Sequence, residues 1–192
     1  MVNSFNLTYN LSWAFLKPAI HLLGTDFEVN GRENIPQDSR FIAAANHSSM
    51  MDIPAVVISL YPHRVRFIMK QSHSQGIVGK GYGLFNPIIA NGAYFGREFY
   101  DVIQNNQTIG IFPEGTRSLD GKISRFKSGA TKISEMLNLP ILPLGISGTY
   151  ENWPRNKLLP SGGKVTVNIG RQIEPGASVE YLHKQIKTLS GQ

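Results

Sequence analysis

One short run of the chain places an imidazole and a carboxylate at a fixed spacing. Asn46–Asp52 reads Asn-His-Ser-Ser-Met-Met-Asp, so that His47 precedes Asp52 by five residues. A carboxylate that accepts a hydrogen bond from one imidazole nitrogen fixes the tautomer and makes the other nitrogen a better base. The run therefore offers the side chains for general-base catalysis.

The spacing of this pair also indicates where it lies. On one helix the two side chains would be about 140° apart and could not meet. They can meet if the histidine follows a strand at Arg40–Ala45 and the aspartate begins a helix at Met50–Leu60. Ser48 and Ser49 are N-cap candidates for that helix, and Pro54 is tolerated only near a helix start. The carboxyl end of a strand is where α/β sheets place their sites.

The chain offers no recognisable nucleophile for this base. The run Gly145–Gly148 reads Gly-Ile-Ser-Gly, which does not match the G-x-S-x-G elbow of a nucleophilic serine. We therefore expect the substrate to bring the hydroxyl that is activated. The alternative is structural: a loop histidine and an aspartate that stabilises a helix N-terminus through the helix dipole.

A second run, Phe112–Ser118, reads Phe-Pro-Glu-Gly-Thr-Arg-Ser and follows an apolar strand. Gly115 lets the backbone approach a ligand closely, and the Arg117 guanidinium has the fork geometry that suits a phosphate. Because Glu114 would repel a phosphate, we expect it to accept from a substrate hydroxyl or to orient Arg117. The alternative is a surface turn closed by a Glu–Arg pair.

The elements that must position these runs alternate between strands and helices. The predicted strands are Thr25–Asn30, Arg40–Ala45, Val65–Met69, Ala93–Phe95, Thr108–Phe112, Ile141–Ile146 and Lys164–Ile169. The predicted helices are Met50–Leu60, Glu98–Asn106, Ser128–Leu137 and Val179–Leu189. This alternation predicts a single α/β domain over residues 25–192, with a mixed central sheet flanked by helices.

Residues 1–24 differ from the rest of the chain. Residues 5–23 are rich in Phe, Trp, Leu and Ile, and Pro18 should break or kink a helix there. We expect an amphipathic segment at a membrane interface, the alternative being a helix that packs on the core. No apolar run approaches the roughly 20 residues that span a bilayer, and the N-terminus does not fit a signal peptide.

Composition narrows the class of protein. The 192 residues are 41% hydrophobic and 17% charged, which is typical of a globular domain. The absence of cysteine fits a reducing compartment, so we expect a cytoplasmic protein. A net charge of +6 favours an anionic partner, but the basic residues are scattered and no nucleic-acid motif is present. No metal-ligand spacing relates His21, His63, His73 and His183.

Four blocks of the sequence resemble the glycerophospholipid acyltransferases, whose best-known members acylate lysophosphatidate. The NHxxxxD block is Asn46–Asp52, and FPEGTRS is complete at Phe112–Ser118. Gly92–Arg97 is similar to the glycine–apolar–arginine block of the family, and Leu139–Pro143 to its proline-containing strand. The resemblance covers about residues 25–175, and the NHxxxxD and FPEGTRS blocks in this order along the chain are highly specific.

The resemblance implies a mechanism. His47, held by Asp52, would deprotonate the acceptor hydroxyl, which attacks the thioester carbonyl of an acyl donor with no acyl-enzyme. Backbone N–H groups near Gly115 are expected to stabilise the oxyanion. The residues implied in binding the glycerol-phosphate moiety are Lys70, Arg97, Glu114, Gly115, Thr116 and Arg117.

The resemblance also implies the partners. The acceptor would be 1-acyl-glycerol-3-phosphate, giving phosphatidate in phospholipid biosynthesis, and the donor an acyl-CoA or acyl carrier protein thioester, with no cofactor. We expect a peripheral protein on the inner, cytoplasmic face of an anionic membrane, with no nucleic-acid partner. The alternatives are another lysophospholipid or glycerol-3-phosphate as acceptor, a non-catalytic lipid-binding module, and a hydrolase.

Overall fold

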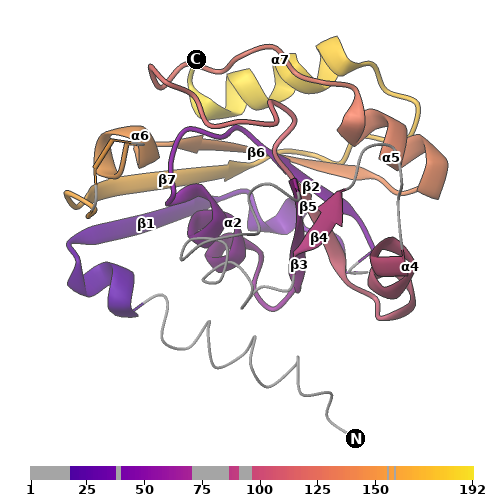
Figure 1. Ribbon diagram of the computed structural model, residues 1–192, viewed down its shortest axis with the longest axis horizontal. Helices are drawn as coiled ribbons and strands as arrows, with labels where there is room; N and C mark the ends of the chain where they lie inside the picture. The colour runs from indigo at the N-terminus through magenta and orange to yellow at the C-terminus, as the bar shows by residue number, and fades with distance from the viewer. Residues whose placement is uncertain (1–17, 38–39, 71–86, 91–96, 155, 158) are drawn as a thin grey trace, which may run out of the picture.

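The computed structural model describes residues 18–37, 40–70, 87–90, 97–154, 156–157 and 159–192. A seven-stranded mixed sheet, in the order β1-β7-β6-β2-β5-β3-β4, forms its centre (Figure 1). The strands are β1 (Thr25–Asn30), β2 (Ile42–Ala45), β3 (Val65–Lys70), β4 (Ile88–Ala90), β5 (Thr108–Ile111), β6 (Ile141–Ser147) and β7 (Gly163–Ile169).

Helices cover both faces of the sheet. They are η1 (Arg32–Asn34), α2 (Asp52–Leu60), α4 (Arg97–Gln104), α5 (Gly129–Leu137), α6 (Thr149–Asn152) and α7 (Val179–Ser190). Buried side chains of α2 form one apolar cluster with the sheet, while those of α4, α5 and α7 form a second. Figure 1 shows α2 below the sheet and α7 above it. The single α/β domain predicted from the sequence is confirmed.

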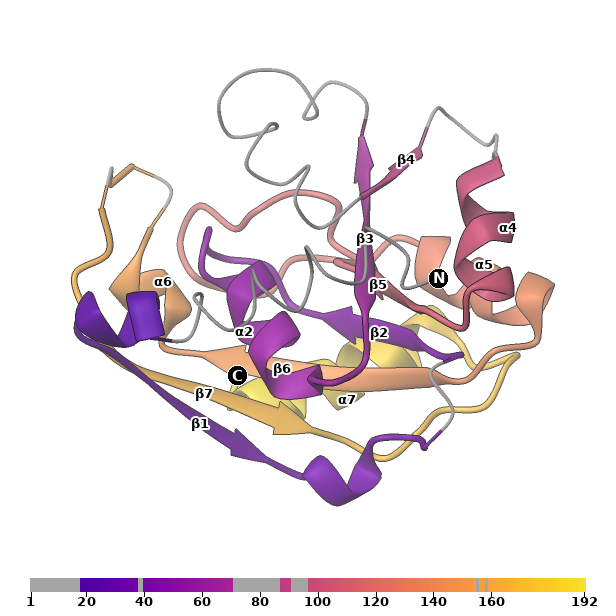
Figure 2. The same cartoon turned by 90° about the horizontal axis from the view of Figure 1, so that it is seen from below.

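Strand directions bring several loops to one edge of the sheet. Strands β6, β2, β5, β3 and β4 are parallel, so the loops that follow β2, β5 and β6 leave from the same edge. Strand β7 is antiparallel to β6, and β1 is parallel to β7, so β1 and β7 begin at that edge. In Figure 2 the starts of β1 and β7 lie together with α6 at the left. We call this the His47 edge, because His47 follows β2 there.

The packing of β2 and β6 explains why their sequences are small and apolar. Side chains of β2 alternate between the two clusters, Ala43 and Ala45 facing α2 while Ile42 and Ala44 face the other helices. A Cβ at Gly145 of β6 would lie 2.2 Å from the backbone of Leu189. Glycine is therefore required where α7 crosses β6, because any side chain would push the helix off the sheet.

The structure corrects some of the predicted elements. Most helices and strands begin and end within one or two residues of their predicted bounds. Strand β4 and helix α6 were not predicted, because three and four residues are too short to show a period. The strand predicted at Ala93–Phe95 lies outside the described residues.

Part of the N-terminal segment can be described. Residues 18–22 are helical, and Ile20 is buried in the same cluster as α2. Its neighbours Leu22 and Leu23 point to solvent. In the part of the chain that the structure describes, no helix has the length and apolar character needed to cross a bilayer. Whether residues 1–24 form a membrane-interface segment stays a prediction.

Candidate active site

His47 and Asp52 meet at the junction between β2 and α2. The imidazole Nδ1 lies 2.8 Å from Asp52 Oδ2, with His47 16% exposed and Asp52 completely buried. The predicted loop-to-helix geometry is therefore confirmed. Because a carboxylate only accepts hydrogen bonds, Nδ1 carries the proton and Nε2 is the nitrogen that can accept one.

The carboxylate of Asp52 also shapes the loop that carries the histidine. Its Oδ2 accepts from the backbone N–H groups of Ser48 and Ser49, each at 2.7 Å. Asp52 is the first residue of α2, so its negative charge also lies at the positive end of the helix dipole. One carboxylate oxygen thus fixes the loop, the helix start and the imidazole ring.

The serines of this run do not cap α2 as predicted. Met51 occupies the N-cap position, and no side chain caps it. Ser49 Oγ instead accepts from the Met51 N–H at 3.0 Å and donates to the Trp153 carbonyl at 2.6 Å. Ser48 Oγ lies 3.2 Å from Thr149 Oγ1. Both hydroxyls are engaged with the chain, so neither serves the imidazole as a nucleophile.

Asn46 fastens the start of the loop to β6. Its side-chain amide donates to the Ile146 carbonyl at 2.9 Å, and its Oδ1 accepts from the Ile146 N–H at 2.8 Å. Asn46 is 2% exposed, so both bonds form away from water. An asparagine has both donor and acceptor on one planar group, which explains why this residue type suits the position.

Glu114 joins the second run to His47. Its Oε1 accepts from the His47 N–H at 2.7 Å, and its Oε2 accepts from the N–H and Oγ of Ser124, both at 2.9 Å. The His47 carbonyl in turn accepts from the Ser118 N–H at 2.8 Å. Glu114 is 3% exposed, and both its oxygens are used within the chain. Glu114 therefore positions the backbone of His47, and neither of its carboxylate oxygens is bonded to Arg117.

An aromatic stack supports the imidazole. The His47 ring lies parallel to the Phe112 ring, with centroids 3.9 Å apart and planes at 12°. Phe67 stacks on the same Phe112 ring at 5.3 Å. The stack and the bond to Asp52 together hold the ring in one orientation, which preorganises it for proton transfer.

Basic side chains gather around the turn at Gly115. Gly115 has φ of 72°, a conformation that favours glycine. A Cβ there would lie 2.9 Å from Lys127 Nζ, so the lysine ammonium lies over the open side of the turn. Arg117 is partly exposed and has no hydrogen-bond or ion-pair partner among the described residues. Within the described ranges, no carboxylate forms an ion pair with either Arg117 or Lys127.

Gly115 itself does not offer an oxyanion donor. Its N–H donates to the Phe112 carbonyl at 3.0 Å and closes the turn. The expectation that backbone N–H groups near Gly115 stabilise the oxyanion stays a prediction for the neighbouring residues.

A model of the acyltransferase family matches residues 26–147, which include both runs and the strands between them. The chain belongs to the acyltransferase family. The resemblance seen in the sequence blocks is therefore confirmed, and the enzyme is an acyltransferase.

Relatives of this acyltransferase are similar over most of its length. The crystal structure of the 1-acyl-sn-glycerophosphate acyltransferase from Thermotoga maritima aligns with a TM-score of 0.81 at 32% identity, covering 95% of this chain and 78% of that one. The 1-acyl-sn-glycerol-3-phosphate acyltransferases of Borreliella burgdorferi and Bacillus subtilis are each 27% identical. This chain aligns over 95% and 88% of its own length and spans 76% and 82% of theirs. It spans 48% of the Chlamydomonas reinhardtii relative, which is 29% identical.

The remaining predicted site residues of the acyltransferase lie around the same edge. Lys70 ends β3 with an exposed side chain, and Thr116 is exposed at the Gly115 turn. Arg97 is the first residue of α4, but its side chain lies outside the described part of the chain. The acyltransferase thus keeps Lys70, Thr116 and Arg117 as accessible polar groups.

Sequence reasoning missed several residues that build the acyltransferase site. Ser124 binds Glu114, Lys127 covers Gly115, and Thr149 and Trp153 hold the serines beside His47. These contacts join residues far apart in the chain, and no motif marks them. Asn46 stands directly before His47 in the sequence, so its residue type was the one signal of these contacts that the sequence displays.

We expect Glu114→Gln to lower the melting temperature by roughly 3–8 °C, because an amide NH₂ would face the donors of Ser124 or His47. Burial raises the pKa of Glu114 above its ordinary value of 4.5, against the opposing effect of its hydrogen bonds to Ser124 and His47. The folded protein therefore holds this proton more tightly than the unfolded chain does. Glu114 consequently contributes most stability below pH 4.5, and the contribution falls as the pH rises through the folded-state pKa.

Thermal melts of wild type and Glu114→Gln, followed by circular dichroism between about pH 4 and pH 7, test the direction of this pH dependence. The melting-temperature gap between wild type and Glu114→Gln should shrink as the pH rises. Glu135→Gln, an exposed change on α5, is the control and should show no such trend. A gap that widens with pH would contradict the account of Glu114.

Proposed function

We propose that this acyltransferase transfers an acyl chain from an acyl thioester to the free hydroxyl of 1-acyl-glycerol-3-phosphate, giving phosphatidate for phospholipid biosynthesis. The observation that carries the proposal is the oriented His47–Asp52 pair, with both neighbouring serine hydroxyls occupied elsewhere. Relatives named 1-acyl-sn-glycerol-3-phosphate acyltransferases support the choice of acceptor.

The chemistry follows from the tautomer of His47. Its Nε2 takes the proton of the acceptor hydroxyl as the oxygen attacks the thioester carbonyl. The tetrahedral intermediate then expels the thiolate, which takes the proton back from the imidazolium. A new ester C–O bond replaces the C–S bond, and no residue of the enzyme is acylated. No cofactor is needed for these steps.

Charge supports the choice of substrates. The acceptor phosphate would bind at the Gly115 turn between Arg117 and Lys127, with Thr116, Lys70 and Arg97 as further ligands. Coenzyme A and acyl carrier protein are both acidic, so either donor suits a chain of net charge +6. We place the enzyme on the cytoplasmic face of a membrane, peripherally bound, because its acceptor is a membrane lipid.

A panel of acceptors tests the function directly. Purified enzyme is mixed with acyl-CoA or acyl carrier protein thioester and with lysophosphatidate, other lysophospholipids or glycerol-3-phosphate, and products are read by mass spectrometry. We expect phosphatidate from lysophosphatidate to dominate. Folded protein that forms no ester with any acceptor would point to a lipid-binding module, and fatty acid released without acceptor to a hydrolase.

We expect Arg117→Ala to raise the KM for lysophosphatidate by roughly 10–100-fold while lowering kcat much less, because a charge-assisted contact to the phosphate is lost. Lys127→Ala should act in the same direction. Arg171→Ala is the matched control, since Arg171 is exposed beyond the end of β7, at the opposite edge of the sheet. An unchanged acceptor KM in both site variants would exclude the Gly115 turn as the phosphate site.

A further inference from the structure

Exposed aliphatic side chains are concentrated at one edge of the molecule. Among the described residues, four leucines are half or more exposed at the His47 edge, and we call them the leucine rim. They are Leu22 at 88%, Leu23 at 50%, Leu119 at 76% and Leu159 at 68%. Met136 is the remaining exposed aliphatic residue in the described chain and ends α5, at the opposite edge. Single exposed leucines need no explanation, but four around one site do.

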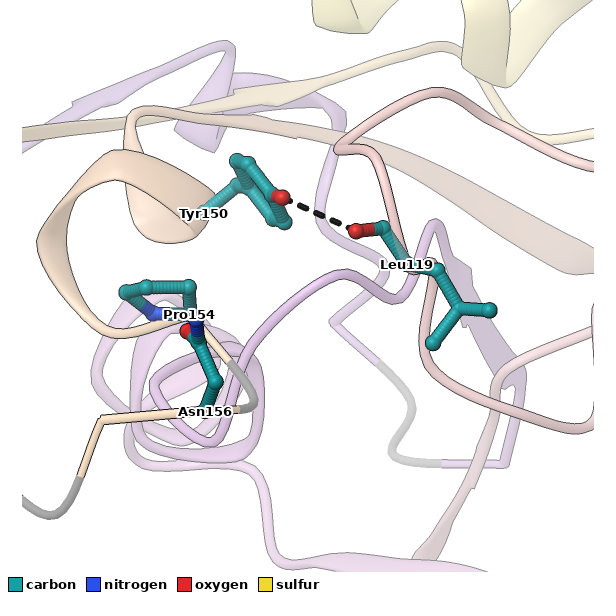
Figure 3. Close-up of a pocket in the computed structure, with 4 residues that line it drawn as sticks. All are labelled: Leu119, Tyr150, Pro154 and Asn156. Atoms are coloured by element: carbon teal, nitrogen blue, oxygen red, sulfur yellow. Dashed lines mark hydrogen bonds between the residues drawn. The ribbon is translucent and has the colours of Figure 1, made fainter.

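Hydrogen bonds hold the segments that carry these leucines to neighbouring parts of the same edge. Leu22 and Leu23 precede β1 and Leu159 precedes β7, and these two strand starts are joined by the Gly163 N–H donating to the Gly24 carbonyl at 2.8 Å. Leu119 lies in the loop after β5. The hydroxyl of Tyr150 in α6 donates to its carbonyl at 2.9 Å. Figure 3 shows this bond, with the Leu119 side chain pointing away from Tyr150.

The loop that carries Leu119 is held to the loop that carries the proposed base. A pocket of about 340 Å³ lies between the loop after β5 and the segment formed by α6 and the residues that follow it (Figure 3). It is lined by Leu119, Tyr150, Pro154 and Asn156. Three of its four lining residues, Leu119, Tyr150 and Pro154, each follow a residue bonded to the His47 loop. The pairs are Ser118 with His47, Thr149 with Ser48, and Trp153 with Ser49. These bonds hold the loop that carries Leu119, and α6 with the residues after it, to the loop that carries the imidazole.

Basic residues outnumber acidic ones in the loop that carries Leu119. The loop at 112–128 contains four basic residues, Arg117, Lys122, Arg125 and Lys127, against Asp120 and the buried Glu114. Lys157 is exposed two residues before Leu159. Leucines interleaved with cations are the combination that binds an anionic lipid surface, with the apolar groups at the boundary between headgroups and acyl chains.

We propose that the leucine rim is the surface on which this enzyme docks to an anionic bilayer. Leu119 and Leu159 enter the interface on either side of the pocket, and His47 then faces lipids still held in the leaflet. The proposal rests on the proposed function, because only an acceptor that resides in a bilayer makes this docking useful. It assigns membrane contact to two loops of the folded domain, in addition to residues 1–24.

Vesicle binding without any acyl donor tests the rim independently of turnover. Leu119→Ser with Leu159→Ser removes two apolar anchors that are exposed, so the double variant should fold with an unchanged melting temperature. We expect its partition onto vesicles of equal phosphatidylglycerol and phosphatidylcholine to fall about ten-fold in co-sedimentation. Inserted segments contribute multiplicatively, so this loss is measurable even when residues 1–24 also bind. Met136→Ser is the matched control and should bind like wild type.

Turnover on two forms of acceptor completes the test. The double variant should lose activity on lysophosphatidate presented in vesicles but keep wild-type kcat/KM on a soluble short-chain lysophosphatidate. If the double variant partitions onto vesicles like wild type, or if Met136→Ser loses as much vesicle binding, the leucine rim is not the docking surface. If wild type forms no phosphatidate from either form of acceptor while the partition difference persists, the proposed function fails and the docking surface stands.

Discussion

Replacing His47 with alanine is expected to lower kcat for acyl transfer by about 10²–10⁴-fold, because no other base replaces the imidazole at the acceptor hydroxyl. Acceptor KM should change little, since His47 does not bind the phosphate in this account. The loss is measured as steady-state release of the donor thiol in the presence of lysophosphatidate. His47 is 16% exposed and stacked on Phe112, so the melting temperature should fall only modestly.

His183→Ala is the matched control for this change. His183 lies on α7 and makes an edge-on contact with Phe126 at 4.7 Å, so its loss also removes an imidazole packed on a phenylalanine. We expect wild-type turnover from this variant. An active His47→Ala enzyme, or an equal loss in His183→Ala, would remove the general-base role from His47.

Asp52→Asn is expected to lower kcat by roughly 10²–10³-fold with the fold intact, because the amide keeps the shape of the carboxylate but not its charge. The amide oxygen can still accept from Ser48 and Ser49. The amide NH₂ would then take the place of Oδ1, which has no hydrogen-bond partner in the described chain. The imidazole loses the negative partner that stabilises the positive charge it gains as it takes the acceptor proton.

The chain contains a second His–Asp pair that serves as the control. His21 Nδ1 lies 2.9 Å from Asp26 Oδ1, close to the distance at the site, but both side chains are 75% exposed. Exposed pairs of this kind contribute little. Asp26→Asn should therefore leave kcat unchanged. If Asp52→Asn keeps the wild-type kcat, the Asp52 carboxylate is not needed to orient His47 for turnover.

Local patterns were enough to predict the core of the site. Helical geometry excluded a shared face for His47 and Asp52, and Pro54 required a helix start nearby, so the strand-to-helix junction followed. The strands were readable because buried parallel strands form continuous apolar runs, as at Thr108–Ile111. These are properties of neighbouring residues, which a sequence displays directly.

What the sequence did not reveal depends on burial and distant contacts. Glu114 was expected to meet a substrate or Arg117, yet it binds the backbone of His47, 67 residues away. Ser49 was expected to cap α2, but it bonds the Trp153 carbonyl, 104 residues away. Short polar side chains choose among several partners, and the tertiary fold decides which one is within reach.

If His47 activates a hydroxyl that belongs to the lipid acceptor, the enzyme itself should never be acylated. Single-turnover release of the donor thiol is measured with and without lysophosphatidate, together with the intact mass of the protein. We expect thiol release only when the acceptor is present, an unchanged protein mass, and loss of that release in His47→Ala. Thiol released without acceptor, or protein heavier by one acyl group, would exclude this role of His47.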